Sequence, residues 1–130
     1  MLNPTIHICV AAALSISALA VAPSSAQTGA ASAGPVTVVA EVSLAANTTP
    51  SEALVALNDM RSMMKRQPGY MSEEFLQNLN ADNTPRYVHV SRWASMNYWA
   101  ALFRTPDFSK LSAHGNEHYT ISVSAFVPAE

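Results

Sequence analysis

The sequence predicts an α+β fold of the ferredoxin-like type, with the element order βαββαβ and one antiparallel sheet. Two observations carry this prediction. Segments that begin near residues 36, 86 and 118 alternate between apolar and other residues, as half-buried strands do. Hydroxyl residues followed by apolar residues at helical spacing mark helix starts between these segments. A length of 130 residues leaves room for one domain.

The first strand and the first helix are predicted one after the other. The strand's inward residues are Val36, Val38, Ala40, Val42 and Leu44. Thr49 is the expected N-cap of the helix, with Pro50 at its first position and Glu52 completing a capping box. The apolar stripe of the helix consists of Leu54, Leu57, Met60 and Met64. Pro68 and Gly69 are expected to end the helix.

Residues 70–94 predict a hairpin of two strands. The first, 70–80, has mixed faces, with one formed by Met71, Phe75 and Leu79 and the other by Tyr70 and Leu76. The turn 81–85 (ADNTP) leads to the clearest strand, 86–94. One face of that strand carries Tyr87, His89, Ser91 and Trp93, and the other carries Val88, Val90 and Arg92. We expect Arg92 to pair with Glu73 or Glu74 across the strands.

The remaining elements are a short helical region and a last strand. Ser95 is the expected N-cap of a helix that carries Tyr98, Trp99, Leu102 and Phe103. Thr105 and Pro106 restart a helical turn that ends near Gly115. The last strand spans 118–127. Because all helices cover one sheet face, the apolar side chains of the other face predict a homodimer that pairs through its sheets.

The amino-terminal 40 residues contain no Asp, Glu, Lys or Arg. We interpret residues 1–26 as a signal peptide, 27–34 as a flexible spacer and 35–130 as the domain. Cleavage between Ala26 and Gln27 predicts an exported protein, periplasmic or secreted, without membrane attachment. The alternative is an uncleaved anchor, because the segment before the apolar run lacks Lys and Arg.

Charge and cysteine content exclude several classes of function. A net charge of -2 gives no basic surface for nucleic acid. The single cysteine, Cys9, lies in the predicted signal, so the mature chain has no disulfide and no thiolate site. The sequence also lacks a phosphate-cradling glycine loop and a serine elbow, and we predict no cofactor.

Several segments of the chain resemble the antibiotic biosynthesis monooxygenase (ABM) family. They are 67–69 (QPG), 76–80 (LQNLN), 86–95 (RYVHVSRWAS) and 105–108 (TPDF). The resemblance implies a dimeric α/β barrel with a pocket between the sheet and the helices of each protomer. Catalytic members oxidise polycyclic phenols, anthrones or quinols with O2, without metal or flavin, and relatives bind and degrade haem.

The resemblance also implies roles for individual residues. The tryptophan of the anthrone-oxidising branch corresponds to Trp93, a polar residue on the same strand face to His89, and a helix aromatic to Trp99. Leu102 and Asp107 stand where many members have histidine. The residues expected for haem degradation fall at Val42, Leu102 and Ser112, which argues against haem degradation by the usual residues.

Without the family resemblance, His89 is still the strongest candidate for a catalytic role. An imidazole on the strand face that looks toward the helices is suited to act as a base near neutral pH. We predict His89 and Trp93 as catalytic, and as substrate-binding Tyr87, Ser91, Tyr98, Trp99 and His114. The competing interpretation is that His89 is a hydrogen-bonded core residue and that the tryptophans only pack.

A second candidate site, for a metal ion, consists of His114, Glu117 and His118. Because Gly115 is expected to end the helix, His114 and His118 should not share a helical face, and we predict no metal site. The predicted function is therefore a cofactor-independent monooxygenase acting on a phenolic, anthrone or quinol small molecule with O2. The alternative is a non-catalytic exported module of the same fold that binds a hydrophobic small molecule or haem.

Overall fold

The structure, a computed structural model, describes residues 34–130. Its elements are β1 (Val36–Leu44), α3 (Pro50–Lys65), β2 (Tyr70–Gln77), β3 (Tyr87–Trp93), α4 (Met96–Leu102), α5 (Pro106–Gly115) and β4 (Tyr119–Phe126). The predicted signal peptide and residues 27–33 of the predicted spacer lie outside the described residues. Within them the predicted element order is confirmed.

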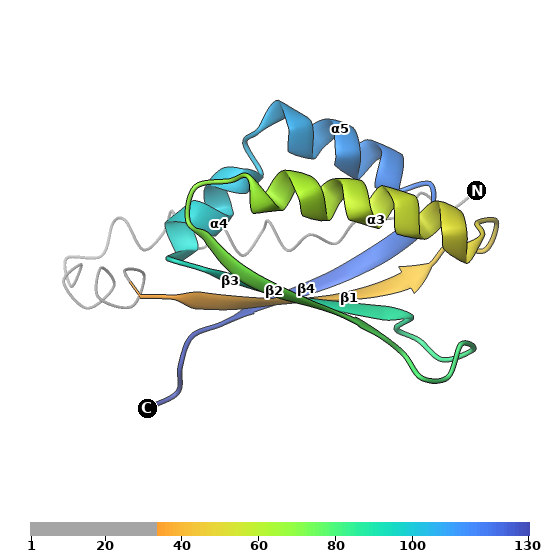
Figure 1. Cartoon of the computed structure of the whole chain (residues 1–130), viewed down its shortest axis with the longest axis horizontal. Coiled ribbons are helices and arrows are strands. Elements are labelled where there is room, and N and C mark those ends of the chain that lie inside the picture. The colour runs from red at the N-terminus through yellow and green to blue at the C-terminus, as the bar shows by residue number, and fades with distance from the viewer. Residues whose placement is uncertain (1–33) are drawn as a thin grey trace.

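The four strands form one antiparallel sheet in the order β2-β3-β1-β4. The central strands are therefore β1 and β3. Figure 1 shows α3, α4 and α5 on the same side of this sheet. The structure thus confirms the predicted ferredoxin-like arrangement, and none of the described helices covers the opposite sheet face.

Local signals set where α3 begins and ends. The Thr49 hydroxyl accepts a hydrogen bond from the Glu52 backbone N–H at 3.2 Å, and the Glu52 carboxylate accepts one from the Thr49 N–H at 3.0 Å. This confirms the capping box. After the helix, Gly69 adopts a φ of 82°, and a Cβ there would lie 2.2 Å from the Tyr98 side chain. Glycine is required at this turn for both reasons.

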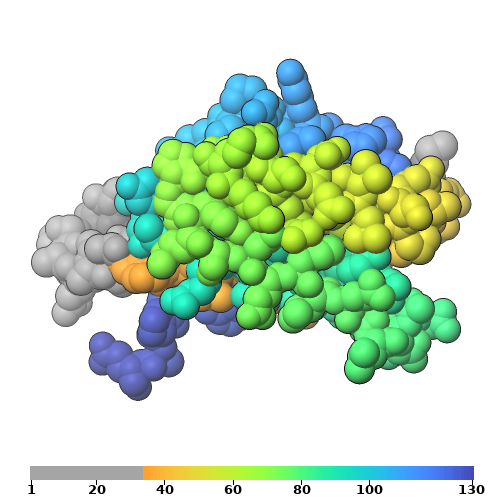
Figure 2. Space-filling view, in the orientation of Figure 1, coloured from red at the N-terminus to blue at the C-terminus, as the bar shows by residue number. Residues whose placement is uncertain are grey.

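Hydroxyl caps also begin the two later helices. The Ser95 Oγ accepts from the Tyr98 N–H at 3.4 Å, and the Thr105 Oγ1 accepts from the Phe108 N–H at 3.2 Å. The Ser95 cap was predicted, and the helix that follows Thr105 begins where the sequence predicted a restart. Figure 2 shows α5 beside α3 on the same flank of the molecule, where the two helices are in contact.

The core lies between the inner sheet face and α3. The alternation predicted for β1 and β3 is confirmed, because their inward residues are buried: Val36, Val38, Ala40, Val42, Tyr87, His89, Ser91 and Trp93. From α3 the buried methionines are Met60, Met63 and Met64. Leu54 of the predicted stripe is only partly buried, while Met63, outside that stripe, is completely buried.

The predicted faces of β2 are confirmed at Phe75, which faces the cavity, and at Leu76, which faces outward, but are wrong at Tyr70 and Met71. An irregularity between Tyr70 and Ser72 shifts the register against β3. Beyond it, Glu73 pairs with Ser91 and Phe75 pairs with His89, so Glu73 turns toward the helices. Met71 is 52% exposed, and Leu79 lies beyond the strand and is fully exposed.

The expected pairing of Arg92 with Glu73 is also wrong, because the ion pairs of Glu73 lie on the inner face.

The outer sheet face carries an apolar centre on neighbouring strands. In the register of the sheet, Val39 lies opposite Val90, and Glu41 lies opposite Val88. Leu76 and Phe126 are about half exposed on the edge strands. No helix within residues 34–130 is long and apolar enough to cross a membrane.

Candidate functional site

A cavity lies between the inner face of the sheet and the three helices. Its volume is about 80 Å³, and most of its wall is apolar. The aromatic residues that line it are Phe75, Trp99, Phe103, Phe108 and Tyr119. The other polar or charged residues on the wall are Arg61, His89, Ser91 and Ser112. An apolar cavity with a few polar groups is the usual form of a small-molecule site.

Three of the predicted site residues lie on the cavity wall: His89, Ser91 and Trp99. His89 and Ser91 point inward together because side chains two residues apart on a strand share a face. Ser91 is completely buried, and its hydroxyl accepts a hydrogen bond from the Trp93 indole N–H at 3.0 Å. The strand β3 therefore presents an imidazole and a held hydroxyl to the same space.

The other four predicted residues do not line the cavity. Trp93 is completely buried against Tyr70, with ring centroids 5.5 Å apart. Tyr87 is buried and stacks on Phe75 at 5.2 Å. Tyr98 is 45% exposed, and His114 is exposed near the end of α5. The positions of these four side chains favour packing or surface roles over direct contact with a substrate.

Glu73 is the functional residue that sequence reasoning missed. Its carboxylate contacts His89 Nε2 at 2.5 Å, Arg61 Nη2 at 2.7 Å and Lys65 Nζ at 2.8 Å. Arg61 Nε also donates to the second carboxylate oxygen at 3.1 Å. Arg61 and Lys65 are four residues apart on α3, so both reach the same point above β2. The one signal in the sequence was this pair of cations facing the acidic residues of the next strand.

The charges around Glu73 determine its protonation state. Burial by itself raises the pKa of a carboxyl group, but hydrogen bonds from Arg61, Lys65 and His89 outweigh it and lower the pKa of Glu73 to about 2. Glu73 is therefore a carboxylate at neutral pH and can only accept hydrogen bonds. His89 Nε2 must then carry a proton and donate it to Glu73, which leaves the lone pair of the neutral ring on Nδ1.

His89 is held as the neutral base. Burial lowers the pKa of His89, and the positive charges of Arg61 and Lys65 act in the same direction, against the opposing effect of Glu73. Among the described residues, the His89 ring makes its hydrogen bond through Nε2 to Glu73, and Nδ1 makes none. A neutral imidazole with one nitrogen fixed by a carboxylate and the other available is the arrangement of a general base.

Acid is expected to destabilise the chain through this network. The folded pKa of His89 lies below its ordinary value, so stability falls as the pH drops below about 6.5. The folded pKa of Glu73 is about 2 rather than 4.5, so its contribution is complete above pH 4.5 and is lost as the pH falls toward 2. Urea unfolding across this range should show a steadily decreasing free energy of unfolding. A constant value would contradict the network.

The aromatic part of the wall is loosely anchored. Trp99 packs edge-on against Phe103 at 4.9 Å, and Phe103 packs against Phe108 at 4.8 Å. The only buried residue of α4 is Leu102, and that of α5 is Gly115. A cavity of about 150 Å³ holds one benzene ring, so about 80 Å³ is too small for a polycyclic molecule. We expect α4 and α5 to move outward when a ligand binds.

Tyr119 closes one end of the cavity. Its hydroxyl is buried and has no hydrogen-bond partner among the described residues. Burial raises its pKa to about 12, so the phenol stays protonated and can donate. A Cβ on Gly115 would lie 2.3 Å from this hydroxyl, which explains why α5 has glycine there. Tyr119 lies in the predicted last strand, but no local pattern in the sequence indicates that its hydroxyl lacks a partner.

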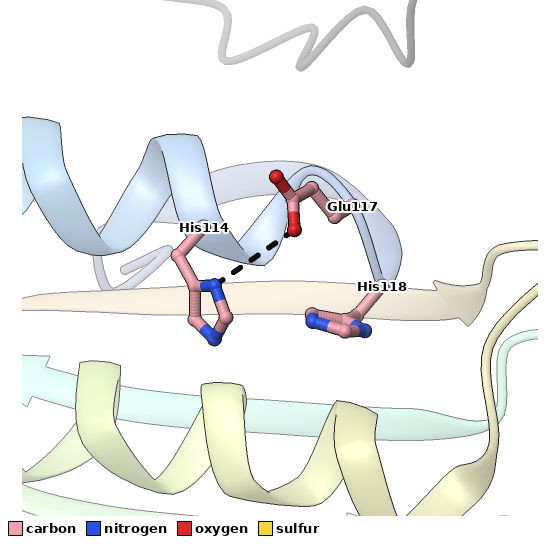
Figure 3. Close-up of side chains that lie close together, drawn as sticks. All are labelled: His114, Glu117 and His118. Carbon is pink, nitrogen blue, oxygen red and sulfur yellow. Dashed lines mark ion pairs between the residues drawn. The ribbon is translucent and has the colours of Figure 1, made fainter.

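The described residues contain one group with the composition of a metal site, and it lies outside the cavity. The ligand atoms of His114, Glu117 and His118 are all within 4.8 Å of one another. Figure 3 shows these side chains together where α5 turns toward β4. The expectation that His114 and His118 lie apart was wrong, because the turn after Gly115 continues the helical path.

A comparison with protein families identifies the chain. The sequence model described as antibiotic biosynthesis monooxygenase matches residues 35–113, more than half of the 130 residues. The chain belongs to this family. ABM membership confirms the resemblance of the sequence motifs and places the chain, at the level of the family, among small-molecule oxygenases. No curated protein matches the sequence.

Solved structures share the ABM fold at low sequence identity. SnoaB, a cofactor-independent oxygenase from Streptomyces nogalater, is 19% identical, with a TM-score of 0.66, over 75% of this chain and 96% of that one. The hydroxynitrile lyase of Passiflora edulis is 12% identical, with a TM-score of 0.64, over 75% and 96%. A dimeric protein of unknown function from Bacteroides fragilis is 14% identical, with a TM-score of 0.57, over 73% and 97%. At these identities the likeness concerns the fold.

Proposed function

We propose that this ABM protein is a cofactor-independent monooxygenase that oxidises a phenolic, anthrone or quinol small molecule with O2. The observation that carries the proposal is the position of His89. Its ring lies on the wall of an apolar cavity, and Glu73 fixes one of its nitrogens. Such a site can deprotonate a flat aromatic molecule whose anion then reduces O2 by itself.

Oxidation of an anthrone illustrates the reaction, in which the substrate itself supplies the electrons and no added reductant is needed. Nδ1 of His89 takes a proton from the ring CH2, and the resulting anion gives one electron to O2. The carbon radical and superoxide combine into a peroxide. Loss of the second CH2 hydrogen breaks the O–O bond, so one oxygen atom stays as a carbonyl and the other leaves as water. The proton held by His89 returns to the departing oxygen.

Charge around the cavity supports the anionic steps. Arg61 and Lys65 contribute two positive charges against the single carboxylate of Glu73. The guanidinium of Arg61 also lies 4.3 Å from the centre of the Phe75 ring, on the cavity wall. The surplus positive charge stabilises a bound phenolate or superoxide, and more strongly so in an apolar surrounding.

Oxygen consumption tests the proposal. The purified chain is mixed with a panel of anthrones and quinols in an oxygen electrode, with no metal or flavin added. We expect uptake above the rate of autoxidation for at least one flat phenolic substrate. Binding of these compounds without uptake would contradict the enzymatic proposal.

A non-catalytic binding module is the second candidate. Val42, Leu102 and Ser112 all line the cavity at the positions that the haem-degrading branch uses, and the first two are apolar. These residues favour a hydrophobic ligand over haem. Absorbance titration with haemin beside fluorescence titration with anthrones distinguishes the two ligands. Saturable binding without oxygen uptake is the result that favours this candidate.

We also propose a homodimer that buries the outer sheet face. Its support is the apolar centre of that face, which includes Val39, Val90 and Leu76, and the dimer stated for the related fold from Bacteroides fragilis. Export with cleavage after Ala26 stays a prediction from the sequence.

Introducing a charged side chain on the outer sheet face should break the dimer. We expect Val90→Glu to sediment as a monomer, because an unpaired carboxylate would be buried between the sheets. Val55→Glu is the matched control, since Val55 is 59% exposed on α3, away from the outer sheet face, and should leave the dimer intact. Sedimentation velocity measures both. A monomeric parent chain, or a dimeric Val90→Glu chain, would contradict the proposed interface.

A further inference from the structure

We propose that His114, Glu117 and His118 bind a divalent transition-metal ion of the zinc class on the surface of the domain. The proposal concerns a site separate from the oxidation cavity, because none of the three residues lines that cavity. Two imidazoles and one carboxylate are a known zinc ligand set, in which three side chains bind the ion and water takes the fourth position.

The backbone brings these residues together at the end of α5. The Glu117 N–H donates to the His114 carbonyl at 3.2 Å, and the His118 N–H donates to the Gly115 carbonyl at 2.9 Å. These bonds extend the helical path for one more turn, so residues three and four apart share a side. The two imidazole rings lie 5.0 Å apart, and His114 Nδ1 is 4.0 Å from the Glu117 carboxylate (Figure 3).

An outer hydrogen bond prepares one of the ligands. His118 Nδ1 lies 2.9 Å from the Thr48 hydroxyl, which itself donates to the Thr49 carbonyl at 3.3 Å. With the hydroxyl proton used in that way, Nδ1–H of His118 is the donor and Nε2 keeps its lone pair. Metal-binding histidines are commonly oriented by donating their second ring N–H to such a partner.

Only small side-chain movements separate the present geometry from a coordinated ion. Ligand atoms at about 2.0–2.1 Å from zinc in a tetrahedron lie about 3.3 Å from one another. The corresponding atoms are within 4.8 Å here. His114 and Glu117 have side chains that are 51% and 72% exposed, so both can rotate without disturbing the core.

Metal binding at this place would fasten three segments. The ligands join the end of α5 to the start of β4, and the Thr48 contact adds the loop between β1 and α3. Gly115, between the ligands in sequence, covers the buried Tyr119 hydroxyl. An ion bound only by the folded chain stabilises it, and here it would also hold one wall of the cavity in place.

Calorimetric titration with Zn²⁺ tests the proposal on the full chain. We expect one ion per chain and a rise in the melting temperature on adding Zn²⁺, with no comparable effect of Mg²⁺, which prefers oxygen ligands. Since losing an outer hydrogen bond alone can cost about 10- to 100-fold in metal affinity, His114→Ala and Glu117→Gln should each weaken binding at least about tenfold.

Glu130→Gln is the control, because it removes an exposed carboxylate elsewhere and should bind Zn²⁺ as the parent chain does. His114→Ala keeps the test independent of folding, because the His114 side chain is exposed and its only polar contact within residues 34–130 is with Glu117. Absence of Zn²⁺ binding to the parent chain would overturn the proposal. Equal affinity of the parent, His114→Ala and Glu117→Gln chains would overturn it as well.

Discussion

Replacing His89 with alanine is expected to lower the rate of anthrone or quinol oxidation by about 10²- to 10⁴-fold, the usual contribution of a general base. The reason is that no other described group on the cavity wall is a neutral base near pH 7. Oxygen uptake and product absorbance measure the effect. Substrate affinity should change much less, since the wall that contacts the rings stays in place.

Added imidazole provides the control for this substitution. His89→Gly leaves a space the size of the lost ring, and free imidazole should restore part of the rate if the ring acts as a base. The melting temperature of each variant separates loss of folding from loss of chemistry. Full activity in a folded His89→Ala chain would contradict the assigned role and favour the interpretation of His89 as a core residue.

Replacing Glu73 with glutamine is expected to reduce both stability and activity. The amide leaves Arg61 and Lys65 together without their shared carboxylate. We expect a loss of about 2 kcal/mol in the free energy of unfolding, which allows for the half-exposed Lys65. Activity should fall because the His89 ring loses the charged acceptor that orients it. Urea unfolding and the oxidation rate measure the two effects.

The pH profile distinguishes positioning by Glu73 from a merely structural role. Glu73 raises the pKa of His89, so its removal should move the acid limb of the rate profile to lower pH. Glu74→Gln is the matched control, because Glu74 is the exposed neighbour on the same strand and should leave the profile unchanged. An unshifted profile in the Glu73→Gln chain would show that the carboxylate does not act through His89.

The fold could be predicted because its signals are local. The alternation in β1 and β3 depends only on the two-residue repeat of a strand, and the caps at Thr49, Ser95 and Thr105 depend on residues within three positions. His89 and Ser91 were found on the cavity wall for the same reason. These features need no knowledge of distant contacts.

The rest of the site depends on contacts that no local pattern records. Alternation places Glu73 on the face of Phe75, but only the pairing of β2 with β3 brings its carboxylate to His89. Trp93 shares the inward face with His89 but lies where Tyr70 covers it, away from the cavity. Tyr98 lies in the first turn of the short helix α4, where it is 45% exposed. Alternation along a strand predicts which sheet face a side chain occupies. The packing of the helices on the sheet determines which of the inward side chains line the cavity.

Labelling with ¹⁸O2 tests most directly whether the cavity carries out a monooxygenation. The purified chain is incubated with an anthrone under ¹⁸O2, without added metal or flavin, and the product is analysed by mass spectrometry. We expect one ¹⁸O atom in the new carbonyl group and the other in water, at a rate that His89→Ala lowers by about 10²- to 10⁴-fold. A product without the label, or labelled product formed equally fast by the His89→Ala chain, would contradict it.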